Sequence, residues 1–172
     1  MDSFCEYLIK MRKTLKEHLI VALIWITAFF LTFVVVDMAL KNPAVWGIIV
    51  IAVVGLFYGA LKLSALFNVE YEMIAVNRDL DIDKITAKSS RKRMITVHLD
   101  KIEEYGEYNQ RTLEHLKSKK FDFKIICANP EDKASYLIYR HPKKGLSLVV
   151  FAVSDNLESE VLKSVPRMLI RK

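Results

Sequence analysis

The chain has 172 residues, of which 27% are charged and 52% hydrophobic, and its formal net charge is +6. The apolar content excludes a disordered chain, and the low counts of 5 Gly and 4 Pro exclude collagen-like and low-complexity sequences. Two cysteines, Cys5 and Cys127, are too few for a disulfide framework. Residues 19–61 contain only two charged side chains, Asp37 and Lys41. This distribution indicates a membrane segment joined to a charged domain of ordinary composition.

Two long uncharged runs follow the N-terminal segment 1–18. At 1.5 Å per residue a helix over either run is about 27–30 Å long, which matches the hydrocarbon thickness of a bilayer. Both runs are apolar on all faces, whereas a surface helix of a soluble protein is apolar on one. We therefore predict a transmembrane hairpin over 19–67, with spans at about 19–40 and 43–66. A pair of buried helices in a soluble protein is the alternative.

Basic residues flank this hairpin unequally. Lys10, Arg12, Lys13 and Lys16 precede the first span and Lys62 closes the second, whereas the connector between the spans carries Lys41 alone. The positive-inside rule then predicts that both termini are cytoplasmic and that the connector lies outside.

The second span contains a GxxxG motif, Gly55 to Gly59. Small residues at this spacing let helix backbones approach closely. The motif fits packing against the first span of the same chain, and it also fits a homodimer or a partner membrane protein.

The remaining residues, 68–172, have the size of one domain and mostly alternate with period two, which predicts short strands. Residues 101–108 are ambiguous between a strand and a turn of helix, and 112–119 fit a helix. A C-terminal helix begins with a capping box, Asp155 and Glu158, and Pro166 should kink or divide it. The predicted strands are 68–77, 80–87, 93–99, 121–128, 135–141 and 146–153.

This succession of strands and one helix resembles a pleckstrin-homology (PH)-like domain, most closely over Val69–Tyr105. The carrying residues are Tyr71, the turn Asn77-Arg-Asp-Leu80, the basic Arg91-Lys-Arg93 and the strand that follows. The whole chain is similar to a bacterial family of small two-span proteins with a domain of unknown function. The resemblance implies a strand barrel plugged by the C-terminal helix, in the plasma membrane of a bacterium. The predicted fold is a two-helix transmembrane hairpin plus a mainly-β, PH-like domain, with an open α+β sandwich as the alternative.

Sequence motifs for catalysis or metal binding are absent. Asp79, Asp81 and Asp83 have the rhythm of a calcium loop, but Lys84 and Ser90 replace its glycine and its glutamate. Alternation with Leu80 and Ile82 indicates the polar side of a strand instead. The four histidines lack metal-ligand spacing, and Cys127 lies in an apolar run typical of a core strand. We expect no enzyme activity, no metal and no cofactor.

The most concentrated charge lies at a predicted turn, with Lys88, Arg91, Lys92 and Arg93. Basic residues near an anionic leaflet gain about 1 kcal/mol each, so we expect these four to contact lipid headgroups or a partner. A solvated hairpin is the alternative. Nucleic-acid binding is not expected, because the net charge is modest and no aromatic residues interleave with the basic ones.

These observations predict an integral membrane protein that presents a cytoplasmic PH-like binding domain at the inner leaflet. The domain would bind protein or lipid headgroups. The alternative is an accessory or scaffold subunit of a larger membrane complex, which contacts partner spans through the Gly55 and Gly59 face.

Overall fold

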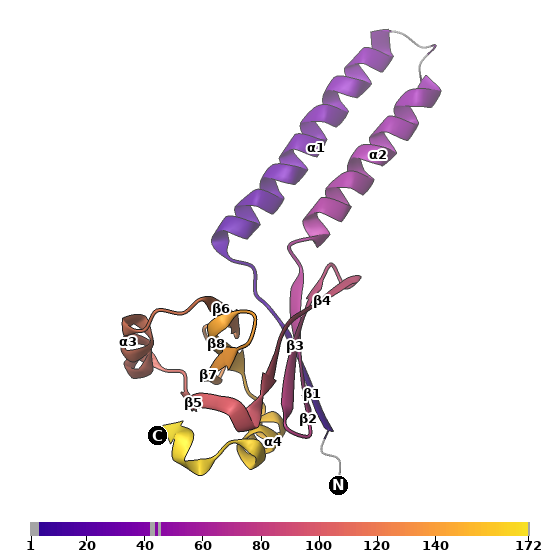
Figure 1. Ribbon diagram of the computed structural model, residues 1–172. Helices are drawn as coiled ribbons and strands as arrows, with labels where there is room; N and C mark the ends of the chain where they lie inside the picture. Colours follow the sequence, from indigo (N-terminus) through magenta and orange to yellow (C-terminus); the bar gives the residue numbers. More distant parts are fainter. Residues whose placement is uncertain (1–3, 42–43, 45, 172) are drawn as a thin grey trace. The chain divides into compact units, whose positions relative to one another are not determined.

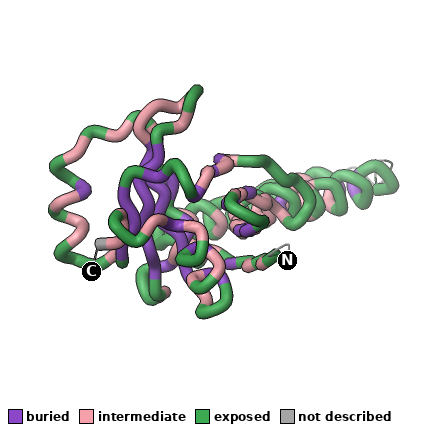
Figure 2. The backbone as a smooth tube through the Cα atoms, turned by 60° about the horizontal axis from the view of Figure 1, so that its bottom comes forward, coloured by how far each residue is buried: buried purple, intermediate pink, exposed green. Residues whose placement is uncertain are grey.

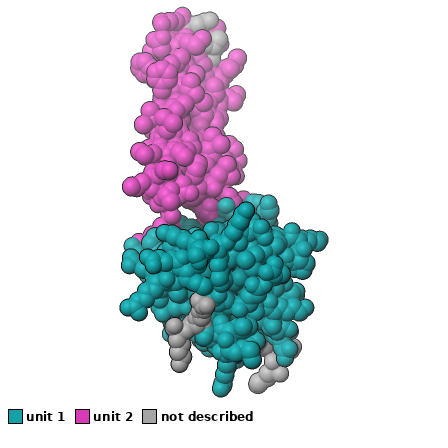
Figure 3. All heavy atoms as spheres, turned by 60° about the vertical axis from the view of Figure 1, so that its left-hand side comes forward, with its two compact units in different colours: residues 1–11, 70–85, 90–172 teal, residues 12–69, 86–89 magenta. Residues whose placement is uncertain are grey.

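The computed structural model describes residues 4–41, 44 and 46–171, which belong to two compact units (Figure 3). One unit comprises 1–11, 70–85 and 90–172, and the other comprises 12–69 and 86–89. The elements along the chain (Figure 1) are β1 (Phe4–Lys10), α1 (Leu15–Lys41), α2 (Trp46–Ala65), β2 (Val69–Val76), β3 (Asp79–Thr86), β4 (Ser90–His98), η2 (Leu99–Lys101), β5 (Ile102–Glu107), α3 (Gln110–Ser118), β6 (Phe123–Cys127), β7 (Ala134–His141), β8 (Gly145–Ala152), α4 (Asp155–Ser164), η3 (Arg167–Leu169) and β9 (Ile170–Arg171).

Helices α1 and α2 are long and apolar enough to cross a membrane, and they are the two such helices among the described residues. Only 6% and 11% of their most apolar windows are buried, whereas the core helices of a soluble protein would be mostly covered. Helix α1 begins with a capping box, in which the Thr14 N–H donates to the Glu17 carboxylate over 2.7 Å. Both predicted spans are therefore helices, although the expected start of the second at residue 43 lies outside the described residues.

A four-stranded sheet has the order β1-β2-β3-β4. Strand β1 runs antiparallel to β2, with Phe4 opposite Val76 and Lys10 opposite Glu70. The sequence prediction placed residues 1–18 outside the domain and began the domain at residue 68. The structure instead gives the domain an additional strand, β1, which is separated from its neighbour β2 by both long helices.

A five-stranded sheet has the order β6-β8-β7-β5-β9. Strand β7 is antiparallel to both neighbours, while the outer pairs β6–β8 and β5–β9 are parallel. Of the ambiguous residues 101–108, Lys101 ends η2 and 102–107 form β5. The predicted helix over 112–119 is α3, which begins two residues earlier.

One hydrophobic core lies between the two sheets and α4. Met73 and Ile82 from the first sheet, Val149 and Phe151 from the second, and Leu157 from α4 are all fully buried in it. The opposite face of the five-stranded sheet packs against α3 through Leu116 and Tyr136. Figure 2 shows the buried strands in purple and the long helices mostly in green and pink.

The C-terminal helix differs from its prediction in one detail. Ser154, rather than Asp155, is the N-cap, and its hydroxyl accepts the Leu157 N–H over 3.3 Å. The division at Pro166 is confirmed, since α4 ends before it and η3 and β9 follow. Two sheets with a C-terminal helix agree with the predicted β plus α layout. The described residues form two open sheets and no closed barrel, so the expected PH-like barrel is not seen.

Candidate functional site

The candidate site is the outer face of the four-stranded sheet, which we define as the face turned away from the shared core. In β1 the side chains of Cys5, Tyr7 and Ile9 pack toward the core, so the alternate ones point outward. The outward residues of β1 and β2 lie opposite one another in the sheet register: Phe4 with Val76, Glu6 with Ile74, Leu8 with Glu72, and Lys10 with Glu70.

Carboxylates of β3 and β2 meet arginines of β4 on this outer face. The Arg91 Nε donates to Asp83 over 2.8 Å, and the same guanidinium forms an ion pair with Glu72. Arg93 forms ion pairs with Asp83 and, over 2.6 Å, with Asp81. Glu72 and Asp83 are 7% and 4% exposed, so the two arginines compensate carboxylates that would be costly to bury alone.

The polar row continues along β3 and β4. Thr96 donates its hydroxyl to Asp81 over 2.6 Å, and the His98 Nδ1 lies 2.6 Å from Asp79. The pKa of Arg93 is raised, chiefly because it donates a hydrogen bond to Asp83. The three aspartates therefore form the polar side of a strand, as the alternation indicated, and hold side chains of the neighbouring strand.

The predicted basic cluster is divided by the strand geometry. Lys92 alternates with Arg91 and Arg93 in β4 and so faces the other side of the sheet. The Lys144 ammonium donates to the carbonyl of Met94, two residues along β4 from Lys92, and the pKa of Lys144 is lowered, first by burial and then by the charge of Lys92. The two arginines thus lie on the outer face beside carboxylates, and Lys92 lies with another lysine.

Lys88, the remaining residue of that cluster, lies in the turn between β3 and β4. Ala87 and Lys88 both have positive φ angles, 54° and 56°. Such angles suit a tight hairpin turn but are strained for residues with a side chain. Lys88 is exposed, so this turn presents a positive charge to solvent at a cost in backbone energy.

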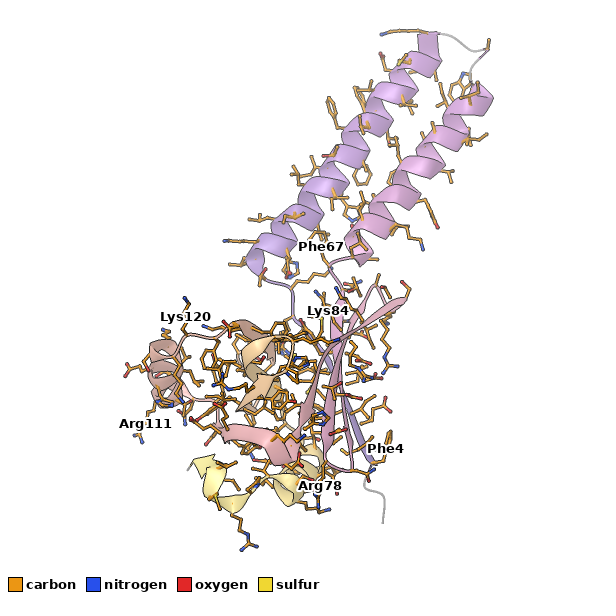
Figure 4. The ribbon with its side chains drawn as sticks, viewed as in Figure 1. Phe4, Phe67, Arg78, Lys84, Arg111 and Lys120 are labelled. Atoms are coloured by element: carbon orange, nitrogen blue, oxygen red, sulfur yellow. The ribbon has the colours of Figure 1, made fainter. Side chains whose placement is uncertain are left out.

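The outer face combines a negative charge with exposed apolar side chains. Its carboxylates outnumber its cations by six to three, a formal charge of −3 with His98 neutral. The carboxylates are Glu6, Glu70, Glu72, Asp79, Asp81 and Asp83, and the cations are Lys10, Arg91 and Arg93. Phe4 and Leu8 are 66% and 48% exposed, and Figure 4 shows Phe4 at the free end of β1. This acidic face was not foreseen, because the whole chain is basic.

A second polar cluster, not predicted from the sequence, surrounds Glu104 on β5. Its carboxylate accepts hydrogen bonds from the Tyr136 hydroxyl over 2.6 Å and from Lys119 over 2.7 Å, and His115 lies 3.3 Å away. Burial alone would raise the pKa of Glu104, but these partners lower it to about 2. A Cβ at Gly106 would lie 3.0 Å from the Tyr136 ring, so the glycine leaves room for that ring. The cluster joins α3 to the five-stranded sheet.

Cys127 and His98, the other side chains considered for chemistry in the sequence, both pack against neighbouring side chains of the domain. Cys127 is fully buried in the core, as predicted, and burial raises its pKa to about 12. His98 contacts Asp79 and lies edge-on to Tyr139 at 6.2 Å between ring centroids. In the part of the chain that the structure describes, no three His, Cys, Asp or Glu side chains are placed to hold a metal ion.

Gly55 and Gly59 line an open groove between α1 and α2. A Cβ at either glycine would have no described atom within 4 Å, so the motif is not used for close packing against α1. The helices instead contact each other through the rings of Trp25, Phe29 and Phe57, with centroid distances of 5.4–6.2 Å.

Comparison with protein families matches residues 1–171 to the model for a bacterial PH-like domain (DUF6106). The chain belongs to this bacterial PH-like family. The match covers β1 and the two long helices as well as the remaining strands, so the family is defined by all of these elements together. It confirms the resemblance inferred from Val69–Tyr105. No curated protein and no solved structure matches the chain.

Proposed function

We propose that this bacterial PH-like protein is a non-enzymatic, membrane-anchored binding module, whose outer face docks a protein partner. In this proposal α1 and α2 cross the plasma membrane, and the two sheets with α3 and α4 form the cytoplasmic domain. The observation that carries the docking role is the exposed pair Phe4 and Leu8 on an otherwise acidic sheet face.

The pairing of β1 with β2 supports a hairpin in the membrane. Because the two strands are hydrogen-bonded from Lys10 and Glu70 to Phe4 and Val76, residues on either side of the helices lie on one side of any bilayer. The chain between them must then cross an even number of times. Lys13, Lys16 and Lys62 flank the ends of α1 and α2 nearest the domain, while Lys41 at the far end pairs with Asp37 over 2.6 Å. The positive-inside rule then places the domain in the cytoplasm.

The chemistry of the outer face favours a protein over a lipid surface. Phe4, Leu8 and Val76 offer apolar contact area, and the surrounding formal charge of −3 attracts basic side chains while it repels anionic headgroups. Arg91 and Arg93 do not reverse this, since both are paired with carboxylates. We therefore expect the partner to present an apolar segment flanked by Lys or Arg.

A photocrosslinking amino acid at position 8, in the full chain in native membranes, tests this proposal. We expect a discrete crosslinked protein, and we expect Phe4→Ser to abolish it without lowering domain stability, because Phe4 is exposed. The matched control places the crosslinker at Met168, which is 90% exposed on η3. Crosslinks to lipid alone, or equal protein crosslinks from both positions, would refute the proposal.

Contact with lipid headgroups through the predicted basic residues is the second candidate function. The exposed position of Lys92 favours it. Lys92 is exposed and forms no ion pair among the described residues, whereas the Lys144 ammonium donates to the Met94 carbonyl and lies 4.2 Å from the Phe123 ring centroid. We expect Lys88 and Lys92 to carry any headgroup contact, with Arg91 and Arg93 contributing little. A fluorophore at Lys92→Cys in a Cys5→Ser chain, compared between neutral and anionic nanodiscs, tests this; an unchanged emission spectrum would remove it.

A further inference from the structure

The groove between α1 and α2 has a volume of about 650 Å³ and an apolar lining, apart from Thr27. Leu23, Ala28 and Leu31 line it from α1, and Gly55, Gly59 and Leu63 line it from α2. It stays open because the aromatic rings of Trp25, Phe29 and Phe57 form the contact between the helices, whereas the glycines offer no side chains to fill it.

The groove has the length of one membrane leaflet. Its lining on α1 runs from Leu23 to Val35, which is about 18 Å at 1.5 Å per residue. One leaflet contributes about 15 Å of the hydrocarbon thickness. Counted from the predicted start of the span at about residue 19, the groove lies between about 6 and 24 Å into the hydrocarbon layer, so an acyl chain of the inner leaflet would lie along the part of the groove on its own side of the bilayer centre.

Both described helices that are long and apolar enough to cross a membrane already form the walls of this groove, so the described part of the chain supplies no further such helix to cover it. A hydrocarbon chain is an occupant that the surrounding bilayer supplies.

The charges at the two ends of the helix pair differ. Lys16 precedes Leu23 and Ile24 by seven and eight residues, so it lies on the groove side of α1. Lys62 follows Gly55 by seven residues and Gly59 by three, and its ammonium lies 5.5 Å from the Tyr58 ring centroid. At the opposite end the cation of Lys41 is compensated by Asp37 over 2.6 Å. A headgroup at the Lys16 and Lys62 end is therefore favoured if it is anionic.

We propose that this groove binds an anionic phospholipid of the inner leaflet, with an acyl chain along Gly55 and Gly59 and the headgroup phosphate between Lys16 and Lys62. The inference rests on the proposed membrane insertion of α1 and α2, but not on the docking role of the outer face. It gives the small-residue motif a ligand in place of a partner helix.

Native mass spectrometry of the full chain in mild detergent, with added phosphatidylglycerol or phosphatidylcholine, tests the site. We expect selective retention of phosphatidylglycerol. Gly59→Leu, which fills the groove, should reduce retention of both lipids at least tenfold, and the matched control Val54→Leu, at a position on α2 outside the groove, should not. The double change Lys16→Gln and Lys62→Gln leaves the groove intact and should abolish the preference between the lipids.

Three results would overturn the proposal: no lipid preference in the native chain, unchanged retention in Gly59→Leu, or disulfide-linked chain pairs from Gly55→Cys in the membrane, which would show a second copy over the groove. Alkaline carbonate extraction of the native membranes separates this failure from a failure of the proposed anchoring. A chain that stays with the membrane but shows no lipid preference refutes the lipid site alone, and a chain that is extracted refutes both.

Discussion

Tyr136 donates a hydrogen bond of 2.6 Å to the Glu104 carboxylate inside the domain, where their exposed fractions are 0% and 8%. The bond joins two neighbouring strands, β7 and β5, and Lys119 adds a charge from the residue that ends α3. Glu104 thus holds one helix and two strands together through a single side chain.

Glu104→Gln should lower the stability of the domain and flatten its dependence on pH. The folded-state pKa of about 2 lies below the ordinary value of 4.5, so the stabilisation is fully present above about pH 5 and is lost as the pH falls toward 2. The lowering of the pKa from 4.5 to about 2 corresponds to about 3 kcal/mol of the free energy of unfolding at neutral pH. Denaturation of the full chain in detergent, followed by near-UV circular dichroism at pH 7 and pH 3, measures it. Glu103→Gln is the control, since its exposed pair with Arg140 should contribute little. Equal losses at both pH values would contradict this account.

Ile9→Ala and Leu8→Ala should differ in effect although the residues are adjacent. Ile9 is buried in the core and its truncation should cost about 2–4 kcal/mol in the free energy of unfolding. Leu8 faces outward, so its truncation should lower the free energy of unfolding by less than about 1 kcal/mol. Denaturant titration of the full chain measures both values, and similar losses would mean that β1 does not hold this register in the sheet.

Lys88→Gly should stabilise the domain by about 1 kcal/mol, since glycine adopts a φ angle of 56° without strain. Lys92→Gly, in the neighbouring strand, removes the same charge from a position with extended backbone and should destabilise it. Midpoints of thermal unfolding compare the two variants. A loss of stability in Lys88→Gly would show that the lysine makes a compensating contact.

Cys127 should resist thiol reagents in the folded chain. It is fully buried and burial raises its pKa to about 12, so the thiolate is scarce and inaccessible at pH 8. Mass spectrometry of a Cys5→Ser chain after maleimide treatment should find no label until denaturant is added. Prompt labelling in the native state would contradict the buried position.

Local sequence patterns were sufficient to predict most of the helices and strands. Uniform apolarity predicted both helices, and period two predicted most strands of the domain. Residues 4–10 also alternate, but a strand is hard to recognise when its partner begins at Val69, beyond two long helices. Whether two sheets close into a barrel is decided by contacts between residues distant in sequence, so no local pattern could predict it.

The candidate site was less accessible to prediction. Arg91, Lys92 and Arg93 form one basic run in the sequence, but a strand directs alternate side chains to opposite faces. The carboxylates that compensate the arginines come from β2 and β3, so their proximity follows from sheet pairing alone. Glu104 gave no sequence signal, because its partners Lys119 and Tyr136 are 15 and 32 residues away.

The position of α1 and α2 between β1 and β2 has a consequence for how the sheet forms. A flexible connection over residues 11–68 would oppose the pairing of these strands through its closure entropy. Two helices packed as an antiparallel pair shorten that flexible connection to the short segments that flank them. The helix pair then connects β1 to β2 in the way that a tight turn connects the strands of an ordinary β-hairpin. Translation makes β1 first, yet β1 can add to the edge of its sheet only after both helices and β2 have been made.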